Sequence, residues 1–195
     1  MKTLYILRHG KTIWNKERKA QGRTDVPLSD EGRQEAYKVK EYIESLNIDG
    51  IYSSPLKRAL ETAEIVSQDI SYKIFKTDDD LIERSFGHYE GELVEKLPFS
   101  ILTKENPEFD GEGVDESADR FKKCLLDIVS NSECERILIV THGGILYNFL
   151  KEYEHFDIND SELSHNPLKN CSITTITYDG KFNIKEIGYL PYKKD

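Results

Sequence analysis

The sequence contains little cysteine and no paired cysteines. Only three of its 195 residues are cysteines, and Cys124, Cys134 and Cys171 are scattered along the chain. An odd number without paired spacing does not fit a disulfide-rich secreted scaffold or a structural zinc site. We therefore expect reduced thiols in a cytoplasmic protein.

The sequence also lacks a long apolar run and an excess of positive charge. No stretch approaches the roughly 20 apolar residues of a membrane-spanning helix. The first apolar run begins at Thr3 and is five residues long, which is too short for a secretory signal. Acidic residues outnumber basic ones by 36 to 27, so a net charge of −9 repels nucleic acid and acidic membranes. We expect neither as a partner.

Motifs of three common enzyme classes are missing. No Gly-x-Gly-x-x-Gly follows a predicted strand and no Gly-x-Ser-x-Gly occurs, which argues against dinucleotide binding and serine hydrolase chemistry. Gly10-Lys11-Thr12 resembles the end of a nucleotide-binding phosphate loop. That loop needs a glycine five positions before Gly10, where this chain has Tyr5, so we treat the match as a coincidence.

The sequence does contain apolar strands that end in charged residues. The run 3–7 stops at Arg8-His9-Gly10, the run 136–140 stops at Thr141-His142-Gly143-Gly144, and a third short strand at 50–55 ends shortly before Arg58. A single histidine after a strand is more often a hydrogen-bonded loop residue than a catalyst, but the pattern recurs here. Parallel strands bring their carboxyl ends to one edge of a sheet. We expect the two arginines and two histidines to meet in one crevice there.

Hydrophobic periodicity places helices between the strands. The expected helices cover 29–46 with Ser29 as N-cap, a stretch from Pro55 to Val66, 117–129 and 145–150; a further strand covers 72–75, and 172–178 with 182–187 forms a hairpin. This alternation predicts an α/β fold, a three-layer α/β/α sandwich with a mostly parallel central sheet and an antiparallel edge hairpin. We expect a single domain, 1–195, in which 98–116 is a loop or short-helix excursion over the site.

The crevice is suited to one compact anion. Arg8 and Arg58 each offer paired donors, and charge-assisted bonds to phosphate oxygens are about twice as strong as neutral ones. In a chain of negative net charge, such a local positive site favours a small phosphorylated ligand over a polyanion.

A series of motifs follows in a fixed order from the first strand to the second histidine. They are Leu7-Arg8-His9-Gly10-Lys11-Thr12 with Asn15, Gln21-Gly22, Asp25-Val26-Pro27-Leu28-Ser29 with Gly32, Ser53-Ser54-Pro55-Leu56-Lys57-Arg58-Ala59 with Thr62-Ala63, Leu81-Ile82-Glu83 with Gly87 and Glu90-Gly91, and Thr141-His142-Gly143-Gly144. These motifs resemble the histidine phosphatase superfamily in its phosphoglycerate mutase-like branch. The resemblance covers residues 4 to about 144 and is compatible with the hairpin that follows.

The resemblance implies a role for each residue of the crevice. His9 would be the nucleophile that forms a phosphohistidine, and Glu83 would act as general acid and then as general base. Arg8, Arg58 and His142 would hold the phosphoryl oxygens. The other substrate-binding residues implied are Gly10, Asn15, Gln21, Gly22 and Gly143. Because arginines and histidines supply the positive charge, we expect no metal and no cofactor.

The likeness leaves two reactions in competition. The mutases of this superfamily carry an arginine pair after the acid to bind a second phosphate, whereas residues 92–109 contain only Lys96 and Lys104 as basic residues. Without that pair, water is favoured as the acceptor, so we predict hydrolysis of small phosphomonoesters. Arg84, which matches the residue after the acid in mutases, keeps mutase-type transfer as the alternative.

Other features leave alternatives open. A non-catalytic phospholigand-binding regulator on the same fold would be expected to lack a catalytic group, and none is missing here. Four aromatic residues either contact the leaving group or pack the excursion onto the domain: Trp14, Phe86, Phe99 and Phe109. The remaining histidines, His88, His155 and His165, are expected in loops or on the surface. The identity of the phosphomonoester and the oligomeric state are not indicated by the sequence.

Overall fold

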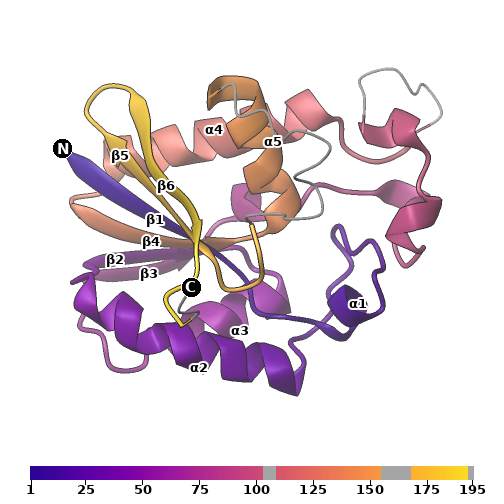
Figure 1. Cartoon of the computed structure of the whole chain (residues 1–195). Helices are drawn as coiled ribbons and strands as arrows, with labels where there is room; N and C mark the ends of the chain where they lie inside the picture. The colour runs from indigo at the N-terminus through magenta and orange to yellow at the C-terminus, as the bar shows by residue number, and fades with distance from the viewer. Residues whose placement is uncertain (103–108, 155–167, 193–195) are drawn as a thin grey trace.

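The computed structural model of the chain describes residues 1–102, 109–154 and 168–192. Within these residues, six strands form one sheet in the order β3-β2-β4-β1-β5-β6 (Figure 1). The strands are β1 (Lys2–Arg8), β2 (Gly50–Ser53), β3 (Ile74–Thr77), β4 (Arg136–Thr141), β5 (Ile173–Tyr178) and β6 (Phe182–Tyr189).

The register of the sheet aligns the strand ends that carry the predicted site. In the parallel pair β1–β4, Arg8 lies opposite Thr141, and in the parallel pair β2–β4, Ser53 lies opposite Val140. The carboxyl ends of β1, β2 and β4 therefore meet at one edge, as predicted. β5 and β6 run antiparallel on the far side of β1 and form the predicted hairpin.

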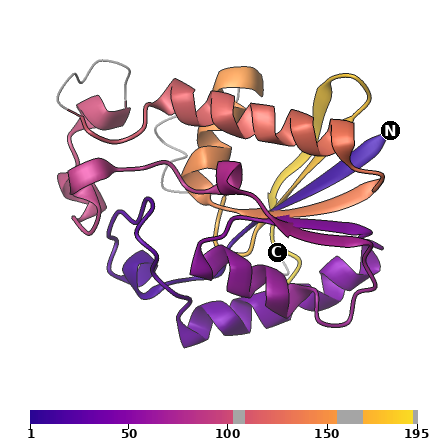
Figure 2. The same ribbon diagram turned by 180° about the vertical axis from the view of Figure 1, so that it is seen from behind.

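Helices cover both faces of the sheet. α2 (Asp30–Ser45) and α3 (Lys57–Val66) lie on one face, and α4 (Val114–Asn131) and α5 (Gly143–Glu154) lie on the other (Figures 1 and 2). Successive β1 side chains alternate between the two cores. Ile6 packs in the cluster that holds Phe121 and Phe149, while Leu7 packs in the cluster that holds Val39. The predicted three-layer α/β/α sandwich is confirmed.

Several element boundaries differ from those expected from the sequence. The fourth predicted strand, 72–75, lies two residues later at Ile74–Thr77, where it forms a half-exposed edge strand. α3 begins at Lys57 rather than Pro55. α4 begins at Val114, about one turn before the expected start at Ser117, and the Glu116 carboxylate accepts the Gly113 N–H there. Local periodicity therefore misplaced the first residues of α3 and α4, whereas the start of α2 after Ser29 agrees with the prediction.

Short irregular segments carry the chain past the carboxyl edge of the sheet (Figure 1). They are the four-residue α1 (Ile13–Lys16) and the 3₁₀ turns η1 (Asp79–Leu81), η2 (Gly87–Tyr89), η3 (Val94–Lys96) and η4 (Phe99–Leu102). Of the predicted excursion, 99–102 forms η4, 114–116 is the first turn of α4, and 103–108 lies outside the described residues. Among the helices described, none is long and apolar enough to cross a membrane.

Ser29 is the predicted N-cap of α2 and also holds the loop that follows Gly10. Its hydroxyl oxygen accepts the Gly32 N–H at 3.1 Å and lies 3.1 Å from the Lys11 carbonyl, to which it donates. Ser29→Ala should lower the free energy of unfolding by about 1 kcal/mol, because the cap is lost. The control Ser45→Ala, in the exposed last turn of the same helix, should change it by less than about 0.5 kcal/mol. Equal effects of the two variants in urea denaturation would contradict this account.

Candidate active site

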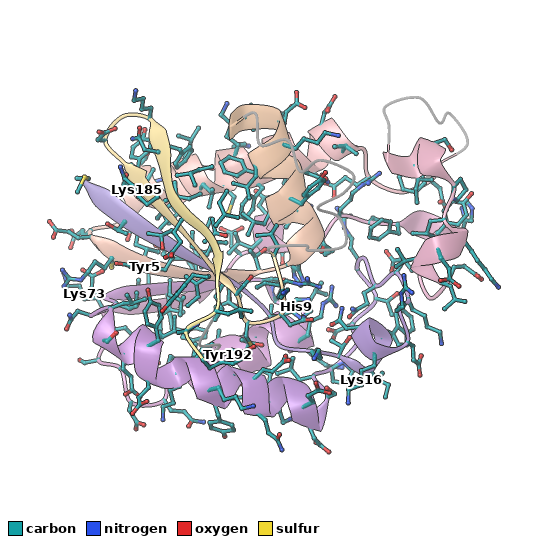
Figure 3. The ribbon with its side chains drawn as sticks, in the orientation of Figure 1. Tyr5, His9, Lys16, Lys73, Lys185 and Tyr192 are labelled. Atoms are coloured by element: carbon teal, nitrogen blue, oxygen red, sulfur yellow. The ribbon has the colours of Figure 1, made fainter. Side chains whose placement is uncertain are left out.

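His9 follows β1 directly and lies where the parallel strands end (Figure 3). Its backbone N–H donates to the Thr141 carbonyl at 3.0 Å, and its side chain is buried, with 3% of the residue exposed. Nδ1 lies 2.7 Å from the Gly10 carbonyl oxygen. A carbonyl only accepts, so Nδ1 carries the proton and Nε2 keeps a lone pair. In this tautomer Nε2 is the ring nitrogen that can accept a proton or form a new bond.

Arg58, from the first turn of α3, has no exposed surface. Its two terminal nitrogens donate to the carbonyls of Gly22 at 2.7 Å and Thr24 at 2.9 Å. Its Nε donates to His142 Nδ1 at 3.2 Å. The guanidinium is thus fixed in one orientation by the loop 22–24 and by the end of β4.

His142 is fully buried beside the two arginines. Because its Nδ1 accepts from Arg58, its proton must lie on Nε2, which donates to the Ser54 hydroxyl at 2.8 Å. Its ring centroid lies 5.1 Å from that of His9. The sequence prediction that these two histidines meet is thereby fulfilled, although His142 lies behind Arg58 rather than at the surface of the cavity.

Arg8 is held at the opposite side of the site. One terminal nitrogen donates to the Leu168 carbonyl. Its buried Nε has no hydrogen-bond partner among the described residues. The guanidinium packs on Gly143, where an added Cβ would lie 3.0 Å from the guanidinium carbon. A buried donor of this kind is stabilised by an anion, which fits a phosphoryl oxygen.

Glu83 occupies the N-terminus of α5. Its Oε2 accepts the Gly144 N–H at 2.9 Å, and its Oε1 accepts the N–H groups of Ile145 at 2.7 Å and Arg84 at 2.9 Å. The positive end of the helix favours a carboxylate at this point. Gly144 permits the approach, since a Cβ there would lie 2.8 Å from Oε1.

Burial and positive neighbours set the charge state of the site. Burial, followed by the charges of Arg58 and Arg8, lowers the pKa of His9 well below its ordinary value of 6.5. The same causes lower the pKa of His142. Burial lowers the pKa of Arg58 to about 10, and the Glu83 carboxylate opposes that shift. At neutral pH the site therefore presents two neutral imidazoles between two guanidinium cations.

The groups line a cavity of about 250 Å³. Of the predicted residues, those that line it are Arg8, His9, Asn15, Gln21, Gly22, Arg58, Glu83 and Phe86. The sequence prediction missed Lys19, Ala20, Val94, Leu97 and Gly144. An isolated antiparallel β-bridge between Lys19 and Leu93 brings Lys19 and Ala20 near Val94 and Leu97. No local pattern indicates such a bridge.

The predicted neutral donors are partly engaged within the protein. We expected the Gly10 N–H to face the cavity, but it donates to the Thr62 hydroxyl at 3.0 Å. Asn15 uses its amide oxygen to accept the Thr12 N–H, as part of the capping box of α1. Gln21 uses its amide oxygen to accept the Thr12 hydroxyl at 2.9 Å. For Asn15 and Gln21, the amide NH₂ is the group suited to a ligand oxygen.

Arg84 does not line the cavity. Its guanidinium is almost fully buried and donates to the carbonyls of Glu112 and Ile101. It also lies 5.5 Å from the Phe86 ring and 5.3 Å from the Phe109 ring. These contacts assign Arg84 and Phe109 to packing, in contrast to Phe86, which packs on Arg84 and also reaches the cavity.

The remaining predicted residues lie away from the cavity lining. His88 is exposed and pairs with Asp110 at 2.8 Å, as expected of a surface loop residue, whereas His155 and His165 lie outside the described residues. Trp14 packs beside Gly91. The three cysteines are buried and free, as predicted. The described part of the chain contains no group of three or more His, Cys, Asp or Glu that could hold a metal ion.

The sequence is similar to those of known proteins. A family model described as the histidine phosphatase superfamily (branch 1) matches residues 4–187. The chain is 33% identical over 190 residues to a Bacillus subtilis (strain 168) protein named uncharacterized phosphatase PhoE, covering 95% of this chain and 94% of that protein. It is 32% identical over 199 residues to the probable phosphoglycerate mutase GpmB of Citrobacter koseri, covering 91% and 86%.

A solved structure extends the likeness to the fold. A mutant phosphoserine phosphatase from Entamoeba histolytica, in complex with phosphoserine, gives a TM-score of 0.83 at 28% identity and covers 98% of this chain and 99% of that chain. The similar proteins therefore carry both phosphatase and mutase names.

The charge state of the two histidines can be tested directly. Forming an imidazolium in this buried site next to two guanidinium groups is unfavourable, so the ring signals of His9 and His142 in NMR should stay those of neutral imidazole from pH 8 down to about pH 6. His9→Gln and His142→Gln would assign the signals. Since each folded pKa lies below the unfolded value, this part of the stability is present above about pH 6.5 and is lost as pH falls. A midpoint at or above 6.5 for either ring would contradict the account.

Proposed function

Because the chain belongs to the histidine phosphatase superfamily, branch 1, we propose that it hydrolyses small phosphomonoesters through a phosphohistidine on His9. The observation that supports this most strongly is the neutral His9 ring, whose Nδ1 proton is bound by Gly10 and whose Nε2 lone pair is free to attack. Two fixed guanidinium groups beside it can hold the phosphoryl oxygens.

In the first step, a bond forms between His9 Nε2 and phosphorus while the bond from phosphorus to the leaving oxygen breaks. Arg8 and Arg58 stabilise the charge on the equatorial oxygens. Glu83, which enters this step as the protonated acid, gives its proton to the leaving oxygen and becomes the carboxylate that the N-terminus of α5 stabilises. We assign this proton to Oε2, because Oε2 accepts one N–H whereas Oε1 accepts two.

In the second step, water attacks the phosphohistidine. A bond forms between the water oxygen and phosphorus, the bond from phosphorus to Nε2 breaks, and a water proton passes to Glu83. Inorganic phosphate leaves, and both His9 and Glu83 regain their starting states. The positive charge in this scheme comes from arginine side chains, so the proposal needs neither a metal nor a cofactor.

Water is the proposed acceptor because, besides Arg8 and Arg58, the cation among the described lining residues is Lys19, which pairs with Glu17 at 2.8 Å, so little is left to hold a second phosphate. Arg84, the residue that favoured mutase chemistry, is engaged with two backbone carbonyls. The wall beyond the catalytic groups is formed by Phe86, Val94 and Leu97, which are apolar. This wall suits a leaving group with an apolar portion. A phosphorylated amino acid, the ligand named for the Entamoeba histolytica enzyme, is one class to include in a substrate screen.

Trapping the intermediate tests the proposed nucleophile. Phosphohistidine is labile in acid and stable in base. Quenching in base during turnover of a ³²P-labelled phosphomonoester should therefore leave base-stable, acid-labile label on His9. His9→Ala should remove both label and turnover, whereas His88→Ala, at an exposed surface pair, should keep both. Label that persists in His9→Ala would refute the assignment. Interconversion of phosphoglycerates with a bisphosphate primer, without hydrolysis of any ester, would refute the choice of water.

The role of Glu83 predicts a dependence on the leaving group. Glu83→Gln keeps the size of the side chain but cannot donate the proton, so kcat for alkyl phosphates should fall about 10²-fold to 10⁴-fold. For p-nitrophenyl phosphate, whose leaving group needs little protonation, the loss in the bond-breaking step should be smaller than about tenfold. Single-turnover kinetics measures this step separately from hydrolysis of the intermediate. An equal loss for both esters would show that Glu83 is not the general acid.

A further inference from the structure

Glu90 lies behind the cavity lining and joins two parts of its wall. Its Oε1 accepts the N–H groups of Arg23 at 2.9 Å and Phe86 at 3.1 Å. Its Oε2 accepts the N–H of Thr24 at 2.8 Å and the Thr24 hydroxyl at 2.6 Å. One carboxylate therefore binds four donors from two segments that are distant in the sequence.

The loop bound by Glu90 is the same loop that fixes Arg58. The carbonyls of Gly22 and Thr24 accept from the Arg58 guanidinium, while the N–H groups of Arg23 and Thr24 donate to Glu90. The peptide units of 22–24 are thus held between a cation on one side and an anion on the other. A shift of this loop would move the Arg58 donors.

The backbone is shaped to admit the Glu90 carboxylate. Gly22 has φ +50°, a left-handed conformation that favours glycine. A Cβ at this position would lie 2.1 Å from Glu90 Oε1, which is too close for any side chain without movement of the carboxylate. The absence of a side chain at Gly22 therefore allows both the left-handed conformation of the loop and the close approach of the Glu90 carboxylate.

We propose that Glu90 is a positioning residue, which holds loop 22–24 so that Arg58 faces the phosphoryl group and holds Phe86 in the wall for the leaving group. This inference rests on the proposed function, because the phosphoryl group is the ligand that Arg58 is positioned to bind. Glu90 itself acts through Arg58 and Phe86 and does not touch the reacting atoms.

The four donors require a carboxylate rather than an amide. Glu90→Gln would retain one acceptor oxygen and place an NH₂ group against at least one backbone N–H, so at least one of the four bonds would be lost, and two if the NH₂ group faces Arg23 and Phe86. Glu92→Gln is a matched control, because it makes the same change at an exposed side chain two residues along the chain.

Two measurements test the proposal on the full chain. Amide hydrogen exchange at Arg23 and Thr24 reports on the loop and needs no turnover. The inhibition constant of inorganic phosphate, with p-nitrophenyl phosphate as substrate, reports on the Arg58 site. In Glu90→Gln we expect faster exchange at both amides, with the phosphate inhibition constant raised and kcat/KM lowered about tenfold or more. In Glu92→Gln all three should stay within about twofold of the unsubstituted protein.

The inhibition constant does not depend on the fraction of folded protein, so a purely structural role would lower only the apparent kcat. Unchanged phosphate affinity in Glu90→Gln, with or without faster exchange, would overturn the inference. If that variant does not fold, Thr24→Val removes one bond to Oε2, and it should raise the phosphate inhibition constant about threefold; no change would likewise overturn the inference. Absence of both phosphate binding and hydrolysis in the unsubstituted protein would instead refute the proposed function.

Discussion

The burial of the Arg58 guanidinium is the constraint on which the rest of the site depends. A guanidinium without exposed surface needs partners for its N–H groups, and here Gly22, Thr24 and His142 accept three of the five. Because His142 accepts at Nδ1, its ring is neutral, and the same positive surroundings keep His9 neutral. The two guanidinium groups give this part of the folded protein an excess of positive charge, which a phosphoryl anion between Arg8 and Arg58 would neutralise.

The register of the sheet brings the residues of the candidate site together. Parallel pairing of β1 with β4 aligns Arg8 with Thr141, so His9 and His142 leave the sheet side by side. The helix that follows β4 offers its N-terminal N–H groups to Glu83, which places a carboxyl group in the same cavity as His9. One sheet edge therefore brings together the residues that we propose as nucleophile, phosphate ligands and proton donor.

The strand-end residues could be predicted because their positions depend on periodicity and on parallel pairing, both of which are visible in the sequence. The contact between Glu83 and the N-terminus of α5 could not be predicted, because the carboxylate is bound by backbone N–H groups, which nearly every residue type carries. Phe86 was a predicted candidate and lines the cavity, whereas Val94 and Leu97, which also line it, lie outside the expected excursion 98–116. A tertiary bridge between Lys19 and Leu93 brings the stretch that contains Val94 and Leu97 to Lys19 and Ala20, and local sequence does not indicate this pairing. The expected role of Gly10 as a donor to the ligand also failed because of a tertiary contact: the Thr62 hydroxyl on α3 accepts the Gly10 N–H.

The central claim is that phosphorus is attacked twice, first by His9 Nε2 and then by water. Each in-line displacement inverts the configuration at phosphorus, so the two steps together retain it. The most direct measurement is hydrolysis of a phosphomonoester made chiral with oxygen isotopes, in isotopically labelled water, followed by stereochemical analysis of the phosphate released. The account predicts net retention of configuration. Net inversion would show a single direct attack by water and would contradict it.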